Sequence, residues 1–249
     1  MFKKALFFSD IHITSNQDPK YQTLLNHIKT LNPQDVSHLF LLGDIFDLWI
    51  ADRQFFLTQY KELVEELQEK VRLGVKLYYF EGNHDLYLKK FWQNEVGAIV
   101  CHDALDVQLG DQKFHLEHGD QMDPEDRGYL FLRWLLRTPV IKWVAHNIPE
   151  KWIVKLGEWS SKKSRQYTSE VKTIQEDQST KKMLTHAQKI YKKKAFDVFI
   201  CGHTHVHYEN KVKMYNNKEA LVVNLGSWYD HPKSFEFTSI KDYQTQLLS

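Results

Sequence analysis

The chain has 249 residues, of which 42% are hydrophobic and 26% charged, and this composition is typical of a soluble globular protein. Its 33 Lys and Arg residues nearly balance its 32 Asp and Glu residues, which excludes a nucleic-acid-binding polycation. With only two cysteines and no apolar run of about 18 residues, the chain lacks the signature of a disulfide scaffold or a transmembrane helix. We therefore expect a cytoplasmic protein.

Short apolar runs rich in aromatic and β-branched residues predict strands that are buried on both faces. These runs are Ala5–Phe8, His38–Leu42, Val75–Phe80, Lys113–Glu117 and Phe196–Cys201. Apolar residues at helical spacing separate the first three runs, from Tyr21 to Leu31 and from Phe56 to Val71. The alternation of strand and helix predicts parallel crossover units and an α/β fold.

A short polar motif follows each of these predicted strands. In chain order the motifs are Asp10-x-His12, Gly43-Asp44, Gly82-Asn83-His84-Asp85, Glu117-His118-Gly119 and Gly202-His203-x-His205. Because open α/β sheets place their sites at the carboxyl ends of strands, we expect the five motifs to meet at one rim. Within the first motif, the i, i+2 spacing predicts that both side chains lie on the same side of an extended backbone.

The residue types in these motifs are ligands for divalent cations. Carboxylate oxygens and imidazole nitrogens together suit a pair of such ions, and Asp44, on a glycine turn, can present one oxygen to each. Two cations can bind a phosphoryl group, neutralise its charge and activate water. The alternative, that these are unrelated polar loop residues, does not explain why each motif follows a strand-like run.

The second half of the chain has a different sequence pattern. Between residues 129 and 159, tryptophans alternate with arginines and lysines, and Pro139 and Pro149 divide the stretch into short helices. We predict a single domain of residues 1–249 that carries a helical cap insertion at residues 121–194. A plain helical subdomain whose tryptophans pack on the sheet is the alternative. The runs at 221–225, 234–238 and 243–247 predict antiparallel strands that complete a second sheet.

The five motifs, in this order, resemble those of the calcineurin-like metallophosphoesterase superfamily. That resemblance implies a four-layer α/β/β/α sandwich with two divalent metal ions, manganese first and iron, zinc or cobalt as alternatives. It implies that one metal is held by Asp10, His12, His205 and a bridging Asp44, and the other by Asn83, His118, His203 and the same Asp44.

The resemblance also implies which residues act on the substrate. Asn83 stabilises negative charge at phosphorus, His84 protonates the leaving group, and Asp47 orients His84. Asp85 is either a turn residue or a support for His84.

A narrower resemblance covers nearly the whole chain. The segments Ser9–Ile13, Gly43–Asp52, His118–Asp120 and Gly226–Trp228, together with the basic and aromatic cap, are similar to the UDP-2,3-diacylglucosamine diphosphatase family. This similarity implies cleavage of UDP-2,3-diacylglucosamine to UMP and 2,3-diacylglucosamine 1-phosphate in lipid A biosynthesis. It also implies contact of the cap with the inner face of the cytoplasmic membrane. The expected substrate-binding residues are Asp126, Tyr129, Lys162, Lys163 and Arg165.

One position departs from that family, which usually has arginine where this chain has His84. A phosphoesterase acting on a nucleotide or another small ester, with the cap as a selectivity lid, is therefore the alternative. Two hypotheses of another class are a catalytically silent adaptor, which would be expected to lack ligands, and a module that only binds membranes. Neither a nucleic acid nor a protein partner is expected.

Overall fold

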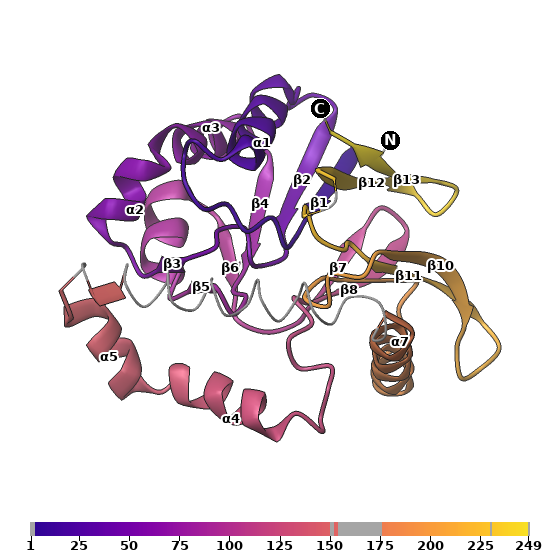
Figure 1. Ribbon diagram of the computed structural model, residues 1–249. Coiled ribbons are helices and arrows are strands. Elements are labelled where there is room, and N and C mark those ends of the chain that lie inside the picture. The colour runs from indigo at the N-terminus through magenta and orange to yellow at the C-terminus, as the bar shows by residue number, and fades with distance from the viewer. Residues whose placement is uncertain (1–2, 150–151, 154–175, 230, 249) are drawn as a thin grey trace.

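The computed structural model describes residues 3–149, 152–153, 176–229 and 231–248, and Figure 1 shows its arrangement. The first half of the chain forms β1 (Lys4–Phe8), α1 (Pro19–Thr30), β2 (Val36–Leu41), β3 (Trp49–Ile50), α2 (Gln54–Gln59), α3 (Lys61–Arg72), β4 (Lys76–Phe80), β5 (Asp85–Leu86), a π-helix η1 (Lys89–Val96), β6 (Ile99–Cys101), β7 (Leu105–Leu109) and β8 (Gln112–Leu116). The second half forms α4 (Arg127–Leu136), α5 (Pro139–Asn147), α7 (Glu176–Lys193), β9 (Val198–Cys201), β10 (Tyr208–Lys213), β11 (Glu219–Asn224), β12 (Lys233–Ser239) and β13 (Asp242–Leu247).

Two large sheets carry the fold. The first has the order β13-β12-β1-β2-β4-β6, in which the last four strands are parallel and β12 and β13 are antiparallel additions. In the second, ordered β10-β11-β9-β8-β7, the three central strands are parallel and each outer strand is antiparallel to its neighbour. The parallel strands β1, β2 and β4 of the first sheet and β8 and β9 of the second are the five predicted runs. Their carboxyl ends form the rim that carries the polar motifs.

The C-terminal strands divide between the two sheets, so the prediction that they jointly complete a second sheet is wrong. Of the three predicted C-terminal strands, only β11 lies in the second sheet. The other two, β12 and β13, extend the first sheet, in which β12 pairs with β1. This placement puts Phe235 and Phe237 of β12 into the core between the sheets. Burial of such side chains, worth about 1.5–3 kcal/mol each, explains why the strand is drawn to that edge.

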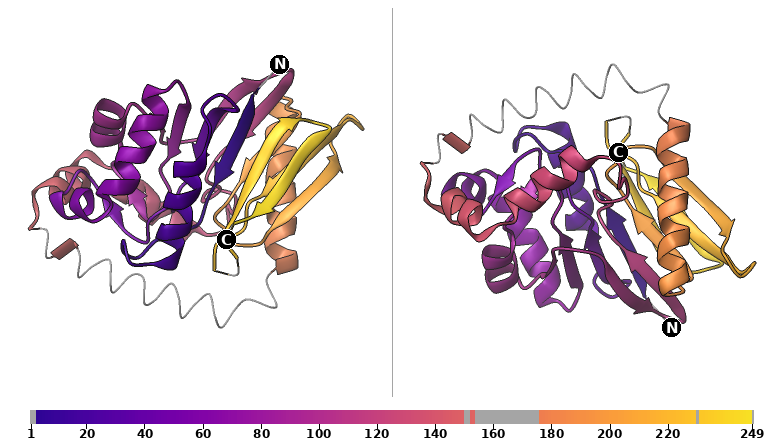
Figure 2. Two further views of the ribbon diagram at one scale, coloured as in Figure 1. Left: turned by 90° about the horizontal axis from the view of Figure 1, so that it is seen from above. Right: turned by 90° about the horizontal axis from the view of Figure 1, so that it is seen from below.

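Three apolar cores define four layers, which confirms the predicted α/β/β/α sandwich. The first core lies between the outer face of the first sheet and the helices α1 and α3, and it includes Leu24, Leu39 and Leu67. The second lies between the sheets, where Phe7 stacks on Phe40 with ring centroids 4.7 Å apart. A third core joins the second sheet to α7, and Figure 2 shows helices outside both sheets.

The helices follow local sequence signals, with one interruption. Asp18 caps α1 by accepting a hydrogen bond from the Lys20 amide, and Pro19 occupies the first turn. The second predicted helix is divided at Tyr60, whose φ of −110° and ψ of 18° end α2 before α3 begins. The pattern predicted to run to Val71 ends at Arg72, and Gly74 follows with a left-handed φ of 96°.

The predicted cap range of 121–194 contains two different environments. The helices α4 and α5 form an arm beside the rim, clearly apart from the sandwich in Figure 1, and we call this pair the cap arm. By contrast, Met183, Ala187 and Tyr191 of α7 pack on the second sheet, so this helix forms the fourth layer. The boundaries of the cap stay a prediction. Among the residues that the structure describes, no helix combines the length and apolar character needed to cross a bilayer.

Candidate metal centre

The five motifs meet at one rim, where three groups of ligand atoms each lie within 4.8 Å of one another. We call the loops that follow β1, β2, β4, β8 and β9 the metal rim. The groups are Asp10, His12 and His205; His12, Asp44 and His84; and Asp44, His118 and His203. The structure thus brings together side chains that are up to 195 positions apart in the chain, from Asp10 to His205 (205 − 10 = 195).

One half of the rim is built around His12. Its Nε2 atom lies 3.2 Å from His205 Nε2 and 3.9 Å from Asp44 Oδ2. The same His205 nitrogen lies 3.4 Å from Asp10 Oδ1. Two imidazole nitrogens and two carboxylate oxygens therefore converge on one point, as a divalent cation requires.

The other half is built around Asn83. Its Oδ1 atom lies 3.3 Å from His118 Nε2 and 3.1 Å from His203 Nδ1. Asp44 Oδ2 lies 3.6 Å from His118 Nε2, so the same oxygen borders both halves. This position is consistent with the bridging role that the resemblance implied for Asp44.

The backbone of the rim is left-handed at most of the predicted ligands, which corrects the expectation of an extended Asp10-x-His12 segment. Positive φ values occur at Asp10 (50°), His12 (53°), Asp44 (53°), His203 (68°) and His205 (61°). For residues other than glycine this conformation costs about 1–2 kcal/mol each. Bonds between the loops hold it: the Asp10 amide donates to Gly43 O at 3.2 Å, and the His12 amide donates to Asp44 O at 3.0 Å. Such strain is concentrated at functional sites in folded proteins.

Each rim carboxylate uses one oxygen for the protein and presents the other to the site. Asp44 Oδ1 accepts hydrogen bonds of 2.9 Å from the amides of Asn83 and His84, while Oδ2 faces the imidazoles. Likewise, Asp10 Oδ2 accepts from the His203 amide at 2.9 Å and from the Ser9 hydroxyl. Asp10 Oδ1 is fully buried and makes no hydrogen bond within the described residues.

Two glycines permit these close contacts. A Cβ atom added to Gly82 would lie 2.1 Å from Asp44 Oδ1, and one added to Gly202 would lie 2.2 Å from Asp10 Oδ2. Any larger residue would push the carboxylate away from its amide donors. The glycine before Asn83 and the one before His203 are therefore required by packing, independently of backbone φ.

The electrostatics of the rim favour a cation. Burial alone lowers the pKa of His118, but the carboxylates of Asp44, Asp10 and Asp120 outweigh it and raise that pKa to about 9. Burial and the neighbouring His118 lower the pKa of His203 to about 4, which leaves its imidazole neutral and able to coordinate. An unpartnered buried carboxylate oxygen, a donor set of oxygen and nitrogen, and a field that stabilises positive charge all fit divalent metal ions.

The predicted proton donor His84 borders this site. Its Nδ1 atom lies 2.9 Å from the backbone oxygen of Asp47, and its ring centroid lies 4.8 Å from that of His12. The Asp47 carboxylate instead lies 3.9 Å from His12 Nδ1. Asp47 therefore touches His84 through its backbone carbonyl, and the orienting carboxylate expected from the sequence faces a different histidine.

Asp85 joins two loops of the rim. Its carboxylate accepts hydrogen bonds from the Ile45 amide at 2.8 Å, the Phe46 amide at 3.3 Å and the Tyr79 hydroxyl at 2.9 Å. These bonds connect the loop that carries His84 to the loop that carries Asp44. Of the two alternatives considered for Asp85, the structure favours a supporting role, exerted on both loops.

The structure describes two of the five predicted substrate-binding residues, and only one of these two lies at the rim. The Tyr129 hydroxyl donates to Asp120 Oδ2 at 2.8 Å, and its ring lies 5.7 Å from that of His203. Asp126 is exposed and caps α4 by accepting from the Tyr129 amide at 2.9 Å. Lys162, Lys163 and Arg165 lie outside the described residues.

Sequence reasoning missed the ion pair that ties the cap arm to the rim. Arg133 Nε lies 2.7 Å from Asp120 Oδ2, the oxygen that also accepts from Tyr129. Tyr129 and Arg133 are four residues apart on α4 and so share one helical face. That spacing, together with an acid two residues after His118, was the signal available in the sequence.

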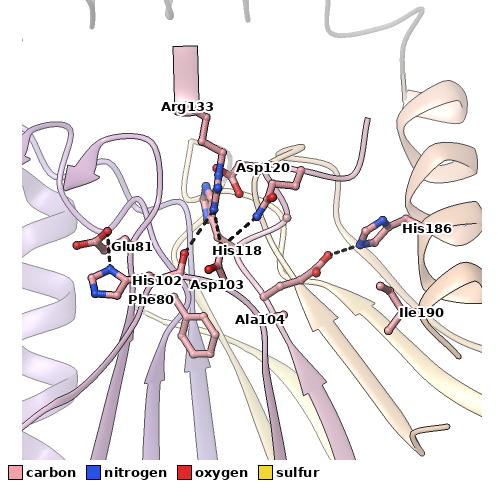
Figure 3. Close-up of a pocket in the computed structure, with 13 residues that line it drawn as sticks. Phe80, Glu81, His102, Asp103, Ala104, His118, Asp120, Arg133, His186 and Ile190 are labelled. Atoms are coloured by element: carbon pink, nitrogen blue, oxygen red, sulfur yellow. Dashed lines mark hydrogen bonds and ion pairs between the residues drawn. The ribbon is translucent and has the colours of Figure 1, made fainter. Parts of the chain in front are cut away.

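A pocket of about 300 Å³, lined in part by charged side chains, lies where the cap arm, α7 and the rim meet (Figure 3). Arg133 enters it from α4 and His186 from α7, while Asp120 contributes a carboxylate near His118 and Glu81 one beside His102. Most of these charges are paired: His102 Nδ1 lies 2.9 Å from Glu81 Oε2, and His186 Nε2 lies 2.9 Å from Glu117 Oε1. The pocket adjoins the metal rim and widens the polar surface available to a ligand.

The chain is similar to known phosphoesterases. The family model described as calcineurin-like phosphoesterase matches residues 3–207. A protein of Tolumonas auensis named UDP-2,3-diacylglucosamine hydrolase is 24% identical over 244 residues, covering 98% of this chain and 96% of the relative. One of the same name from Ectopseudomonas mendocina is 28% identical, covering 90% and 89%. Among solved structures, a dimetal phosphatase from Danio rerio aligns over 100% of this chain and 96% of its own, with 10% identity and a TM-score of 0.47.

Proposed function

This chain belongs to the calcineurin-like phosphoesterase family, and we propose that it hydrolyses UDP-2,3-diacylglucosamine to UMP and 2,3-diacylglucosamine 1-phosphate. The observation that carries hydrolysis is the convergence of the seven predicted ligands with His84 at one buried rim. The choice of substrate is supported by relatives of that name that align over nearly their whole length.

Two divalent cations, when bound, supply charge neutralisation at the phosphoryl oxygens and activation of water. We assign one cation to Asp10, His12, His205 and Asp44, and the other to Asn83, His118, His203 and Asp44. Manganese is the proposed metal, as the resemblance to the superfamily implies; the donor set of carboxylate, amide and imidazole does not itself select it. Iron, zinc and cobalt are alternatives.

The protein itself holds and delivers the proton for the leaving group. When His84 Nδ1–H donates to the Asp47 carbonyl, the Nε2 atom is the nitrogen available to a departing oxygen. The pKa of His84 is lowered by burial but raised more strongly by Asp44, the Asp47 carbonyl and other acids. An imidazolium in this position fits general-acid catalysis.

The cap arm supports an acylated substrate drawn from a membrane. Its exposed side chains include five large apolar ones: Phe131, Leu132, Trp134, Val140 and Trp143. We call these five residues the apolar cap surface. Because basic residues such as Lys142 lie among them, the surface has the composition of an interfacial membrane-binding element. We propose peripheral contact with the inner face of the cytoplasmic membrane through this surface.

The proposal is tested by UMP release from a UDP-2,3-diacyl sugar and, in parallel, from UDP-N-acetylglucosamine. We expect turnover of the acylated substrate to be far faster. Asp44→Ala and His203→Ala should each reduce it by about 10³-fold or more, because each removes a ligand. Asp111→Ala, at an exposed turn, is the matched control and should retain full activity.

The alternatives give different results in the same experiment. Equal turnover of both nucleotide sugars, or activity only on small phosphodiesters, would favour a small-ester phosphoesterase in which His84 replaces the usual arginine. No turnover of any phosphoester by a protein that retains both cations would favour a silent adaptor.

A further inference from the structure

The first turn of α1 places a lysine directly behind one predicted metal ligand. Lys20 Nζ donates hydrogen bonds of 2.6 Å to the carbonyl oxygens of both Ile11 and His12. We propose that Lys20, together with Tyr229, is a positioning device for His12 and thereby sets the affinity of one cation of the pair. This inference rests on the proposed two-metal site and adds two residues outside the family motifs.

The His12 backbone needs such support because its conformation is unfavourable. A φ of 53° is left-handed, and the segment is flanked by Asp10, which has a φ of 50°. In this conformation the two consecutive carbonyls of Ile11 and His12 point to the same side and need donors there. An ammonium group offers three donors, so one Lys20 can satisfy both carbonyls and hold the turn in place.

Tyr229 holds the same ligand from its ring side. Its ring stacks on the His12 imidazole with centroids 5.5 Å apart and an interplanar angle of 16°, and it lies 5.7 Å from the His205 ring. Lys20 Nζ lies 5.0 Å from the centroid of the same tyrosine ring. The backbone and the imidazole of His12 are therefore fixed by two side chains that also contact each other.

Only one half of the metal rim depends on this arrangement. His12 belongs to two of the ligand groups, one with Asp10 and His205 and one with Asp44 and His84, whereas the group of Asp44, His118 and His203 does not include it. Loosening His12 should therefore weaken the binding of one cation and leave the binding of the other unchanged. A counter-effect is expected from charge alone, since a lysine near bound cations repels them. The two effects have opposite signs, which makes the proposal easy to contradict.

The test measures Mn²⁺ binding, independently of hydrolysis, by calorimetric titration and by metal content after gel filtration. For the wild type we expect two tightly bound Mn²⁺ ions per chain. Lys20→Met should retain one of them and bind the second about 10- to 100-fold more weakly, as removal of a support behind a ligand does. Lys20→Arg should restore much of that affinity, because its guanidinium can also donate to both carbonyls.

A matched control exists in the same protein. Lys70 is also largely buried and its Nζ donates to two carbonyls, Lys29 O at 3.1 Å and Leu31 O at 2.9 Å, at the far end of α1. Lys70→Met removes the same number of hydrogen bonds without touching the rim. We expect it to lower the free energy of unfolding while both Mn²⁺ ions stay tightly bound.

A second variant guards against misfolding of the first. Tyr229→Leu keeps an apolar side chain at a partly exposed position but removes the stacked ring, and it should weaken the same single Mn²⁺. Electron paramagnetic resonance adds a measurement that does not depend on the stability of the protein. At limiting Mn²⁺, we expect the spectrum of a coupled Mn²⁺ pair in the wild type and that of an isolated Mn²⁺ ion in Lys20→Met.

The outcomes separate this inference from the proposed function. If the wild type binds fewer than two Mn²⁺ ions, the two-metal proposal fails, and this inference fails with it. If the wild type binds two and Lys20→Met binds both as tightly or more tightly, only the positioning role is overturned. Equal loss in the Lys20 and Lys70 variants would likewise reduce Lys20 to a general stabilising residue.

Discussion

The metal rim and the cap arm lie side by side but are built in opposite ways. In the rim, Asp10, Asp44 and His118 are buried, and several backbone groups bind each of their loops. In the cap arm, α4 buries no residue and α5 buries only Ala145. The arm is attached through a small apolar cluster in which Ala145 packs with Ala51, Leu86 and Tyr87. A few polar contacts add to it, such as Arg133 with Asp120 and the Tyr87 hydroxyl with Leu136 O.

This difference separates chemistry from substrate choice. Coordination and proton transfer require positions fixed to within about 0.5 Å, which close packing and supporting hydrogen bonds provide. A surface that accepts acyl chains or lipid must instead stay uncovered until the ligand arrives. We therefore expect changes at the predicted metal ligands to abolish all activity, and changes in the cap arm to alter only which substrate is used.

The largest effect is expected where rigid packing is broken at the rim. In Gly82→Ala, the new Cβ would lie 2.1 Å from Asp44 Oδ1 and 2.7 Å from its amide nitrogen, so Asp44 must move. We expect loss of tight metal binding and a fall in activity of about 10³-fold or more, checked by metal content and phosphodiester hydrolysis.

Gly74→Ala is the control for this change. Gly74 has a φ of 96° but no atom within 4 Å of an added Cβ, so the substitution strains the backbone far from the rim. It should lower the free energy of unfolding by about 1 kcal/mol and leave metal binding intact. Equal metal loss in both variants would show that the rim fails through general instability and not through local packing.

A smaller and more selective effect is expected at His84. His84→Ala should slow esters with poor leaving groups by about 10²-fold or more, because they need a proton on the departing oxygen. Esters of p-nitrophenol, a good leaving group, should lose much less. The comparison of kcat for the two substrates checks this, with His146→Ala on α5 as control. Equal losses for both substrates would make His84 a structural residue.

The smallest effect on chemistry is expected from the cap arm. The double change Trp134→Ser and Trp143→Ser should weaken binding to vesicles of phosphatidylglycerol and phosphatidylethanolamine by about tenfold or more. Hydrolysis of a soluble phosphodiester should be unchanged, because neither residue contacts the rim. Vesicle sedimentation and a colorimetric assay measure the two quantities.

Tyr215→Ser is the matched control for the tryptophans. Tyr215 is 74% exposed, against 61% for Trp134 and 67% for Trp143, but it lies between β10 and β11, away from the cap arm. If Tyr215→Ser weakens vesicle binding as much as the double tryptophan change does, exposed aromatic area in general drives the interaction. The apolar cap surface then has no special role.

Much of the fold was accessible from the sequence because its signals are local. Apolar runs of four to six residues marked β1, β2, β4, β8 and β9, and the helical pattern from Tyr21 marked α1. The strands that were missed or misassigned, such as β6 and β12, lie at or near sheet edges, where pairing with a distant strand decides the place. Alternation alone does not say which sheet a strand joins.

The site was accessible to a similar extent. The seven predicted ligands were recognisable because residue type and order reflect coordination chemistry. Three features were not: the left-handed backbone at Asp10 and His12, the backbone contact of Asp47 with His84, and the lysine behind His12. Each depends on contacts between loops that are distant in the chain.

The amino-acid sequence by itself determined the chemistry available to this protein: which side chains could ligate cations, and in which order they follow the strands. The tertiary structure alone decided how those side chains are held. Ligand identity is a property of single residues and short motifs, whereas orientation and strain arise from packing between segments that only the folded chain brings within a few ångströms of one another.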